Sequence, residues 1–162
     1  MTQIIPETET ISEIAELREQ IISKRESREV LLEIKKLIPS VNLAGENLMA
    51  IVDSFVMQLG FSGIGDRWKQ INRKSAQKIL IFILNKNLAY AEESIAINDA
   101  ETIANRFMIL FEDNCQFLTN AIFNNNYSRL TEWDSITEST FDTGVVIVSN
   151  ERIGILWVQD ED

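Results

Sequence analysis

Two apolar runs near the carboxyl end constrain the fold of this chain more than any other feature. Residues 145–148 and 153–158 are rich in β-branched side chains, and the polar segment 149–152 separates them. This pattern predicts an antiparallel hairpin. Both faces of the hairpin are apolar, and a lone two-stranded hairpin is marginal in water. We therefore expect either a further strand from residues 61–71 or 89–97, or a second chain that covers the hairpin.

The rest of the chain carries helical periodicity. Only two prolines and six glycines occur, which favours long helices over many short strands. Apolar residues recur at helical spacing in residues 7–38 (interrupted at 23–29), 46–59, 75–91 and 98–123. The pattern predicts an α+β fold that is predominantly helical, with about five helices packed against the C-terminal antiparallel β-hairpin. The length predicts a single domain over residues 1–162.

Polar and glycine-containing segments mark the ends of these helices. Asn98 and Glu101 resemble a variant capping box before the last helix, and Gly60 suits the C-terminal cap of the helix at 46–59. Residues 60–65 contain three glycines but lack the spacing of a dinucleotide- or phosphate-binding loop, so we interpret them as a flexible connector. Residues 124–141 form a second, polar connector.

The chain has no histidine and one cysteine, Cys115. Histidine-dependent nucleophilic triads, histidine-bearing zinc sites and disulfides within the chain are therefore excluded. Cys115 lies on the apolar stripe of the helix expected at 98–123, so we interpret it as a small buried hydrophobe. We expect no cofactor and no metal, and we assign no catalytic residue.

The net charge of −10 is unevenly distributed. Residues 67–91 carry six basic and no acidic side chains, whereas residues 92–162 carry three basic and 14 acidic ones. The overall negative field repels nucleic acid, so we interpret the basic segment as pairing with acidic residues of the same chain. A basic protein is the partner that this field favours.

The amino-terminal residues lack the cationic region and apolar stretch of a secretory signal. The longest apolar run, residues 79–84, has six residues, against about 20 for a membrane-spanning helix. We expect a soluble, cytoplasmic protein without a membrane partner.

The acidic carboxyl-terminal tip and two tryptophans supply the candidate binding residues. The charges of the tip can prevent the apolar edge strand from pairing with another chain, contact a basic partner or bind a cation weakly. The first of these is the simplest interpretation. A tryptophan between charged residues, such as Trp133 between Glu132 and Asp134, is more often a half-buried structural residue than a binding residue. The residues that we name for partner binding are Trp133, Asp134, Trp157, Asp160, Glu161 and Asp162.

Three functional hypotheses follow. The first is a non-enzymatic protein-binding module that neutralises or regulates a basic partner. Immunity-like proteins act in this way, and the analogy with them rests on size and charge alone. The second is a homodimer, or larger self-association, that pairs through residues 141–162. The third is a carboxylate-based hydrolase that uses Asp134, Glu138, Asp142 and the tail, because paired carboxylates in different environments can divide acid and base roles.

Overall fold

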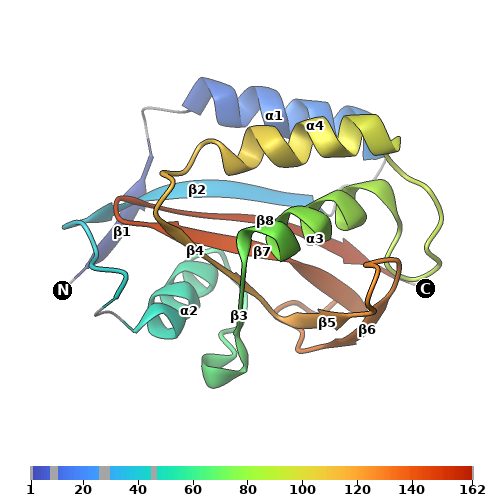
Figure 1. Cartoon of the computed structure of the whole chain (residues 1–162). Helices are drawn as coiled ribbons and strands as arrows, with labels where there is room; N and C mark the ends of the chain where they lie inside the picture. Colours follow the sequence, from blue (N-terminus) through green and yellow to red (C-terminus); the bar gives the residue numbers. More distant parts are fainter. Residues whose placement is uncertain (1, 8–10, 26–29, 45–46, 162) are drawn as a thin grey trace.

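A six-stranded antiparallel sheet dominates the computed structural model, which describes residues 2–7, 11–25, 30–44 and 47–161 (Figure 1). The described residues form four α-helices and eight strands, so the expectation of a predominantly helical chain with about five helices is wrong. The sheet has the order β1-β2-β8-β7-β4-β3. Its strands are β1 (Gln3–Pro6), β2 (Val30–Ile38), β3 (Lys69–Ile71), β4 (Cys115–Thr119), β7 (Phe141–Ser149) and β8 (Arg152–Asp160).

The predicted hairpin is confirmed as β7 and β8, which pair from Phe141 opposite Asp160 to Val148 opposite Ile153. It lies at the centre of the sheet, because β2 pairs with β8 and β4 pairs with β7. Alternate residues point to opposite faces, so that Leu156 joins one core cluster and Trp157 the other. The chain therefore supplies both the strand neighbours and the covering layers that the hairpin needs.

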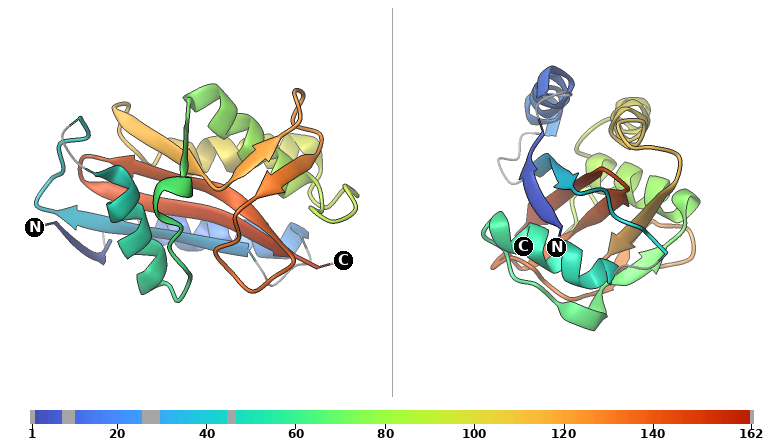
Figure 2. Two further views of the ribbon diagram at one scale, coloured as in Figure 1. Left: turned by 90° about the horizontal axis from the view of Figure 1, so that it is seen from below. Right: turned by 90° about the vertical axis from the view of Figure 1, so that its left-hand side faces the viewer.

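Helices cover both faces of the sheet. The helices α1 (Ile11–Arg25), α3 (Arg73–Asn85) and α4 (Ile97–Met108) lie on one face, and α2 (Leu48–Gln58) lies on the other (Figures 1 and 2). A short hairpin of β5 (Ala121–Phe123) and β6 (Leu130–Trp133) flanks the sheet, and a short 3-10 turn, η1 (Gly65–Arg67), precedes β3.

The helices expected at 46–59 and 75–91 are present as α2 and α3, although α3 ends six residues early. Asn47 and Asn72 cap them, since their side chains accept hydrogen bonds from Ala50 N and Ser75 N. Gly60 follows the end of α2 with a φ of +90°, which confirms its predicted capping position.

The expectation of helix throughout 7–38 is wrong, because its second half is the strand β2. Leu32 and Ile34 are two residues apart and buried on the face of the sheet that α1, α3 and α4 cover, whereas Leu37 belongs to the cluster on the opposite face. This is the period of a strand. Of the two regions in which a further strand was expected, 61–71 contains β3, and 89–97 forms only an isolated bridge, between Lys86 and Glu93.

The long helix expected at 98–123 is also wrong. α4 ends at Met108, and the following residues form β4 and β5. Phe117 and Leu118 face opposite core clusters, since β4 crosses the sheet beside β7. The capping box is wrong as well: the residue before α4 is Ala96, which makes no side-chain cap, and Asn98 lies inside the first turn. No helix in the described residues is long and apolar enough to cross a membrane.

Candidate functional site

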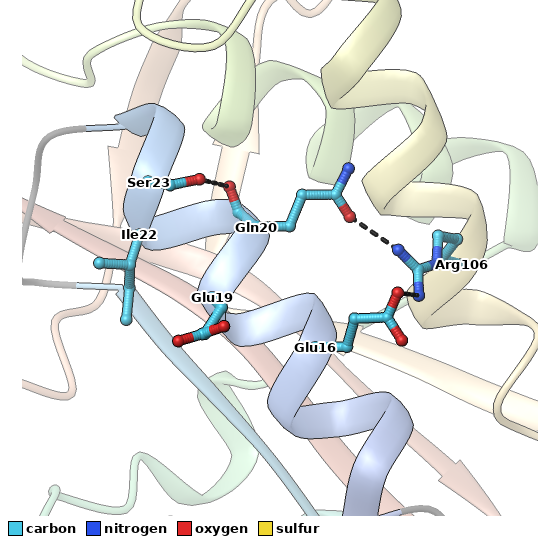
Figure 3. Close-up of a pocket in the computed structure, with 6 residues that line it drawn as sticks. All are labelled: Glu16, Glu19, Gln20, Ile22, Ser23 and Arg106. Carbon is cyan, nitrogen blue, oxygen red and sulfur yellow. Dashed lines mark hydrogen bonds and ion pairs between the residues drawn. The ribbon is translucent and has the colours of Figure 1, made fainter.

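A surface groove lies between α1 and α4, with a volume of about 620 Å³ (Figure 3). Five of its lining residues come from α1 and one from α4. They are Glu16, Glu19, Gln20, Ile22, Ser23 and Arg106.

Helical periodicity explains why α1 presents polar side chains to this groove. Ile14, Leu17 and Ile21 are buried in the core at spacings of three and four residues. The same period places Glu16 and Gln20 together on another face of the helix, beside Glu19 and Ser23. The groove is therefore a consequence of how α1 packs on the sheet.

Arg106 bridges the two helices, but it is already engaged. Its guanidinium lies 3.5 Å from Glu16 Oε1 and donates a 2.7 Å hydrogen bond to Gln20 Oε1 (Figure 3). Glu19 makes no ion pair or hydrogen bond with any other residue that the structure describes. A second bridge joins Lys24 to Asp99 at 3.4 Å. Lys24 and Arg106 are thus paired between α1 and α4, whereas Glu19 has no cationic partner in the part of the chain that the structure describes.

An apolar side chain completes the groove. Ile22 is 50% exposed, although it is a large aliphatic residue. A single exposed aliphatic residue is ordinary on a protein surface. In this groove, however, Ile22 lies one helical turn after Glu19, so it places an apolar contact beside that carboxylate, which suits a cationic side chain with an aliphatic stem (Figure 3).

Trp133 and Asp134 lie together at a different place in the fold. The Trp133 ring stacks on Phe141 with 5.1 Å between ring centroids, and the Asp134 carboxylate forms a 3.1 Å ion pair with Arg67. Both residues are half-buried. They line a cavity of about 250 Å³ together with Lys69, Asn120 and Glu132.

The other residues named for partner binding are mostly inaccessible. Trp157 is fully buried in β8 and its indole N–H donates to Asp142 at 3.1 Å. Asp160 is buried and accepts a hydrogen bond from Leu88 N. Glu161 is exposed, and its hydrogen bonds from Thr140 lower the pKa of its carboxyl group. Asp162 lies outside the described residues.

The carboxylates suggested for hydrolysis do not share one described cavity. Asp142 is fully buried and Glu138 is exposed, whereas Asp134 lines the cavity that it shares with Lys69, Asn120 and Glu132. Among the described residues, no group of three or more acidic or cysteine side chains is arranged to hold a metal ion.

Cys115 lies in β4 rather than on a helical stripe, and it is half-buried. Burial raises the pKa of its thiol, and the guanidinium of Arg73, 3.4 Å from the sulfur, opposes this rise. The net shift is upward, so the thiolate is disfavoured at neutral pH.

Sequence reasoning missed the groove residues. The spacing of Ile14, Leu17 and Ile21 carried enough signal to place Glu16 and Gln20 on an exposed face. Nothing local placed Arg106 opposite them, because that contact depends on how two helices pack. Comparison with known proteins finds no matching family model, no similar curated protein and no similar solved structure.

Proposed function

We propose that this protein is a non-enzymatic binding module that takes a basic segment of a protein partner in the α1–α4 groove. One observation carries the proposal: the groove combines Glu16, Glu19 and exposed Ile22, while Arg106, the one cation among its described lining residues, is already engaged by the groove itself. Charge complementarity therefore favours a cationic occupant.

An arginine or lysine of the partner has a defined place in this groove. Its charged group binds Glu19, and its aliphatic stem lies against Ile22. A second cation can compete with Arg106 for Glu16, because an exposed ion pair of this kind is worth only about 0–1 kcal/mol. The net charge of −10 accelerates the encounter with a basic partner.

The role that follows is to cover a basic surface of the partner and so neutralise or regulate it. This is the function expected from charge and composition, but it is located on α1 and α4 rather than at the carboxyl-terminal tip. The buried positions of Trp157 and Asp160 favour this relocation.

Binding of an arginine-rich peptide tests the proposal; the peptide also contains leucine, which can contact Ile22. We expect Glu19→Lys to weaken binding several-fold, because it removes one exposed cation–carboxylate contact and adds repulsion. Glu138→Lys is the matched control, because Glu138 is exposed between β6 and β7 and the substitution changes the net charge equally. Ile22→Ser tests the apolar contact without any change of charge.

Fluorescence anisotropy of the labelled peptide measures all three affinities at fixed ionic strength. Equal weakening by Glu19→Lys and Glu138→Lys would show that only the overall field acts, and the groove would then be excluded as the site.

A further inference from the structure

A second groove lies on the same layer of helices and has different chemistry. It opens between α3, the start of α4 and the turn at residues 124–128 that joins β5 to β6. Its volume is about 340 Å³, within the range of small-molecule sites, about 300–1,000 Å³. Its lining residues are Lys78, Ile81, Phe82, Asn85, Lys86, Ile97, Asn126, Tyr127 and Ser128.

Aromatic side chains give this groove a fixed apolar wall. Phe82 meets Phe123 edge-on with 5.6 Å between centroids, and Phe123 contacts Tyr127 at 5.9 Å. Ile81 and the 46% exposed Ile97 supply aliphatic surface. A flat ring can lie against such a wall with favourable packing.

The backbone at Tyr127 is held in a conformation that tyrosine disfavours. Its φ is 53°, in the left-handed region. The Tyr127 hydroxyl group donates to Ser75 Oγ at 2.9 Å, and its N–H donates to Asn124 O at 3.0 Å. These contacts fix the ring at the groove, and strained residues of this kind cluster at ligand sites.

Two lysines at this groove lack a carboxylate partner among the described residues. Lys78 Nζ lies 5.6 Å from the centroid of the Tyr127 ring, and Lys86 makes no side-chain ion pair. Glu93 is opposite Lys86 in an isolated backbone bridge, yet no ion pair joins them. The pairing that we expected for the basic segment 67–91 is thus incomplete at this groove.

A buried amide adds an unused acceptor. Asn85 is only 7% exposed, and its Nδ2 donates to Ile95 O at 2.8 Å. That bond fixes which end of the amide carries the oxygen. The structure shows no hydrogen-bond donor for Asn85 Oδ1 among the described residues. A buried acceptor at a cavity wall is costly unless a ligand or water satisfies it.

We propose that this groove binds a small molecule that joins an anionic group to a flat apolar ring. The anionic group binds the ammonium groups of Lys78 and Lys86, and the ring lies between Tyr127 and the aliphatic wall. A donor on the ligand satisfies Asn85 Oδ1. This site is independent of the α1–α4 groove, whose charge is opposite.

Two dyes that differ by one sulfonate group test the site. Anilinonaphthalene sulfonate has an anionic group, a flat ring system and an N–H donor, and phenylnaphthylamine is its neutral counterpart. We expect saturable binding of the sulfonate and about tenfold weaker binding in Lys78→Gln and Lys86→Gln, the loss expected for one charged contact. Lys74→Gln is the matched control, because Lys74 is exposed on α3 and does not line the groove.

The neutral dye identifies the position of binding. Its affinity should be unchanged by either groove lysine substitution, whereas Ile97→Asp should weaken both dyes. Fluorescence titration measures these affinities, and thermal unfolding verifies that each variant is folded. The proposal is overturned if the sulfonate does not saturate, if Lys74→Gln weakens it as much as Lys78→Gln and Lys86→Gln, or if Ile97→Asp affects neither dye.

Discussion

Replacement of Asp142 by alanine gives the sharpest test of how the centre of the sheet is held together. Asp142 is fully buried at the second position of β7. Its carboxylate accepts hydrogen bonds from four groups. They are Ile136 N at 3.1 Å, Trp157 Nε1 at 3.1 Å, Thr137 Oγ1 at 2.8 Å and Asn120 Nδ2 at 3.5 Å.

The size of the effect follows from which donors lose their only acceptor. Asn120 keeps its bonds to the backbone carbonyl groups of residues 134 and 142, and Thr137 is half-buried and can turn toward water. The N–H of Ile136 and the indole N–H of Trp157 remain buried without an acceptor. Each such group costs about 1–3 kcal/mol, so Asp142→Ala should lower the free energy of unfolding by about 2–6 kcal/mol.

Asp142→Asn keeps the size of the side chain and one acceptor oxygen, so it separates the loss of hydrogen bonds from the loss of side-chain volume. The amide oxygen can still accept from Ile136 N and Trp157 Nε1, so we expect a loss of only about 1–2 kcal/mol. Urea unfolding followed by tryptophan fluorescence measures both variants, with Glu138→Ala as an exposed control that stays within about 0.5 kcal/mol of the parent chain. A loss below about 1 kcal/mol for Asp142→Ala, or equal losses for alanine and asparagine, would refute this reasoning.

Two further predictions concern backbone packing and the thiol. At Gly144 an added Cβ lies 2.1 Å from a backbone carbonyl oxygen of β8, whereas at Gly154 it lies 2.4 Å from the ring edge of Phe111. A side chain can move, but a paired strand cannot. Gly144→Ala should therefore lower the free energy of unfolding in urea by more than about 3 kcal/mol, and Gly154→Ala by about 1–3 kcal/mol. A larger loss for Gly154→Ala than for Gly144→Ala would contradict this reasoning. Burial raises the pKa of Cys115 against the opposing charge of Arg73, so alkylation by iodoacetamide should reach its half-maximal rate at a higher pH than for free cysteine. Arg73→Gln removes a cation that stabilises the thiolate, so the pH midpoint should rise further, and a fall would show that another group controls the thiol.

Local patterns predicted part of this fold correctly. The β7–β8 hairpin, α2 and α3 are each specified by residues within one segment, and all three are present. The spacing of their apolar side chains matches the period of the element that they form. These elements could be found without knowledge of the tertiary structure.

The strands β2 and β4 could not be found in that way. β2 pairs with β8, and Val30 lies opposite Val158, more than a hundred residues further along the chain. β4 pairs with β7, where Phe117 lies opposite Ile147. Short apolar runs are compatible with either a helix or a strand, and the partner strand decides between them. The helical interpretation of 30–38 and 115–119 failed for this reason.

The distribution of charge along the sequence also predicted only part of what the structure shows. It predicted that the basic segment 67–91 pairs with acidic residues of the same chain, but pairing depends on what lies opposite each side chain. Arg67 meets Asp134, and Arg73 donates to the carbonyl group of Asp113. Lys78 and Lys86 instead face a cavity with apolar and amide walls. One stretch of sequence thus contributes both to internal pairing and to a candidate anion site.

The hairpin links the fold to both candidate sites. Its two apolar faces require cover on each side, and the chain places three of the four described helices on one of them (Figure 2). α3 packs on the central strands β7, β4 and β8, α1 packs on β2, and α4 contacts both α1 and α3. The two helix pairs formed by α4 differ in the charges that they present: carboxylates on α1 beside α4, and lysines on α3 beside the start of α4. Two grooves of opposite charge therefore follow from covering one apolar face with three helices. Composition, with its single net charge of −10, predicted a basic partner but located neither groove.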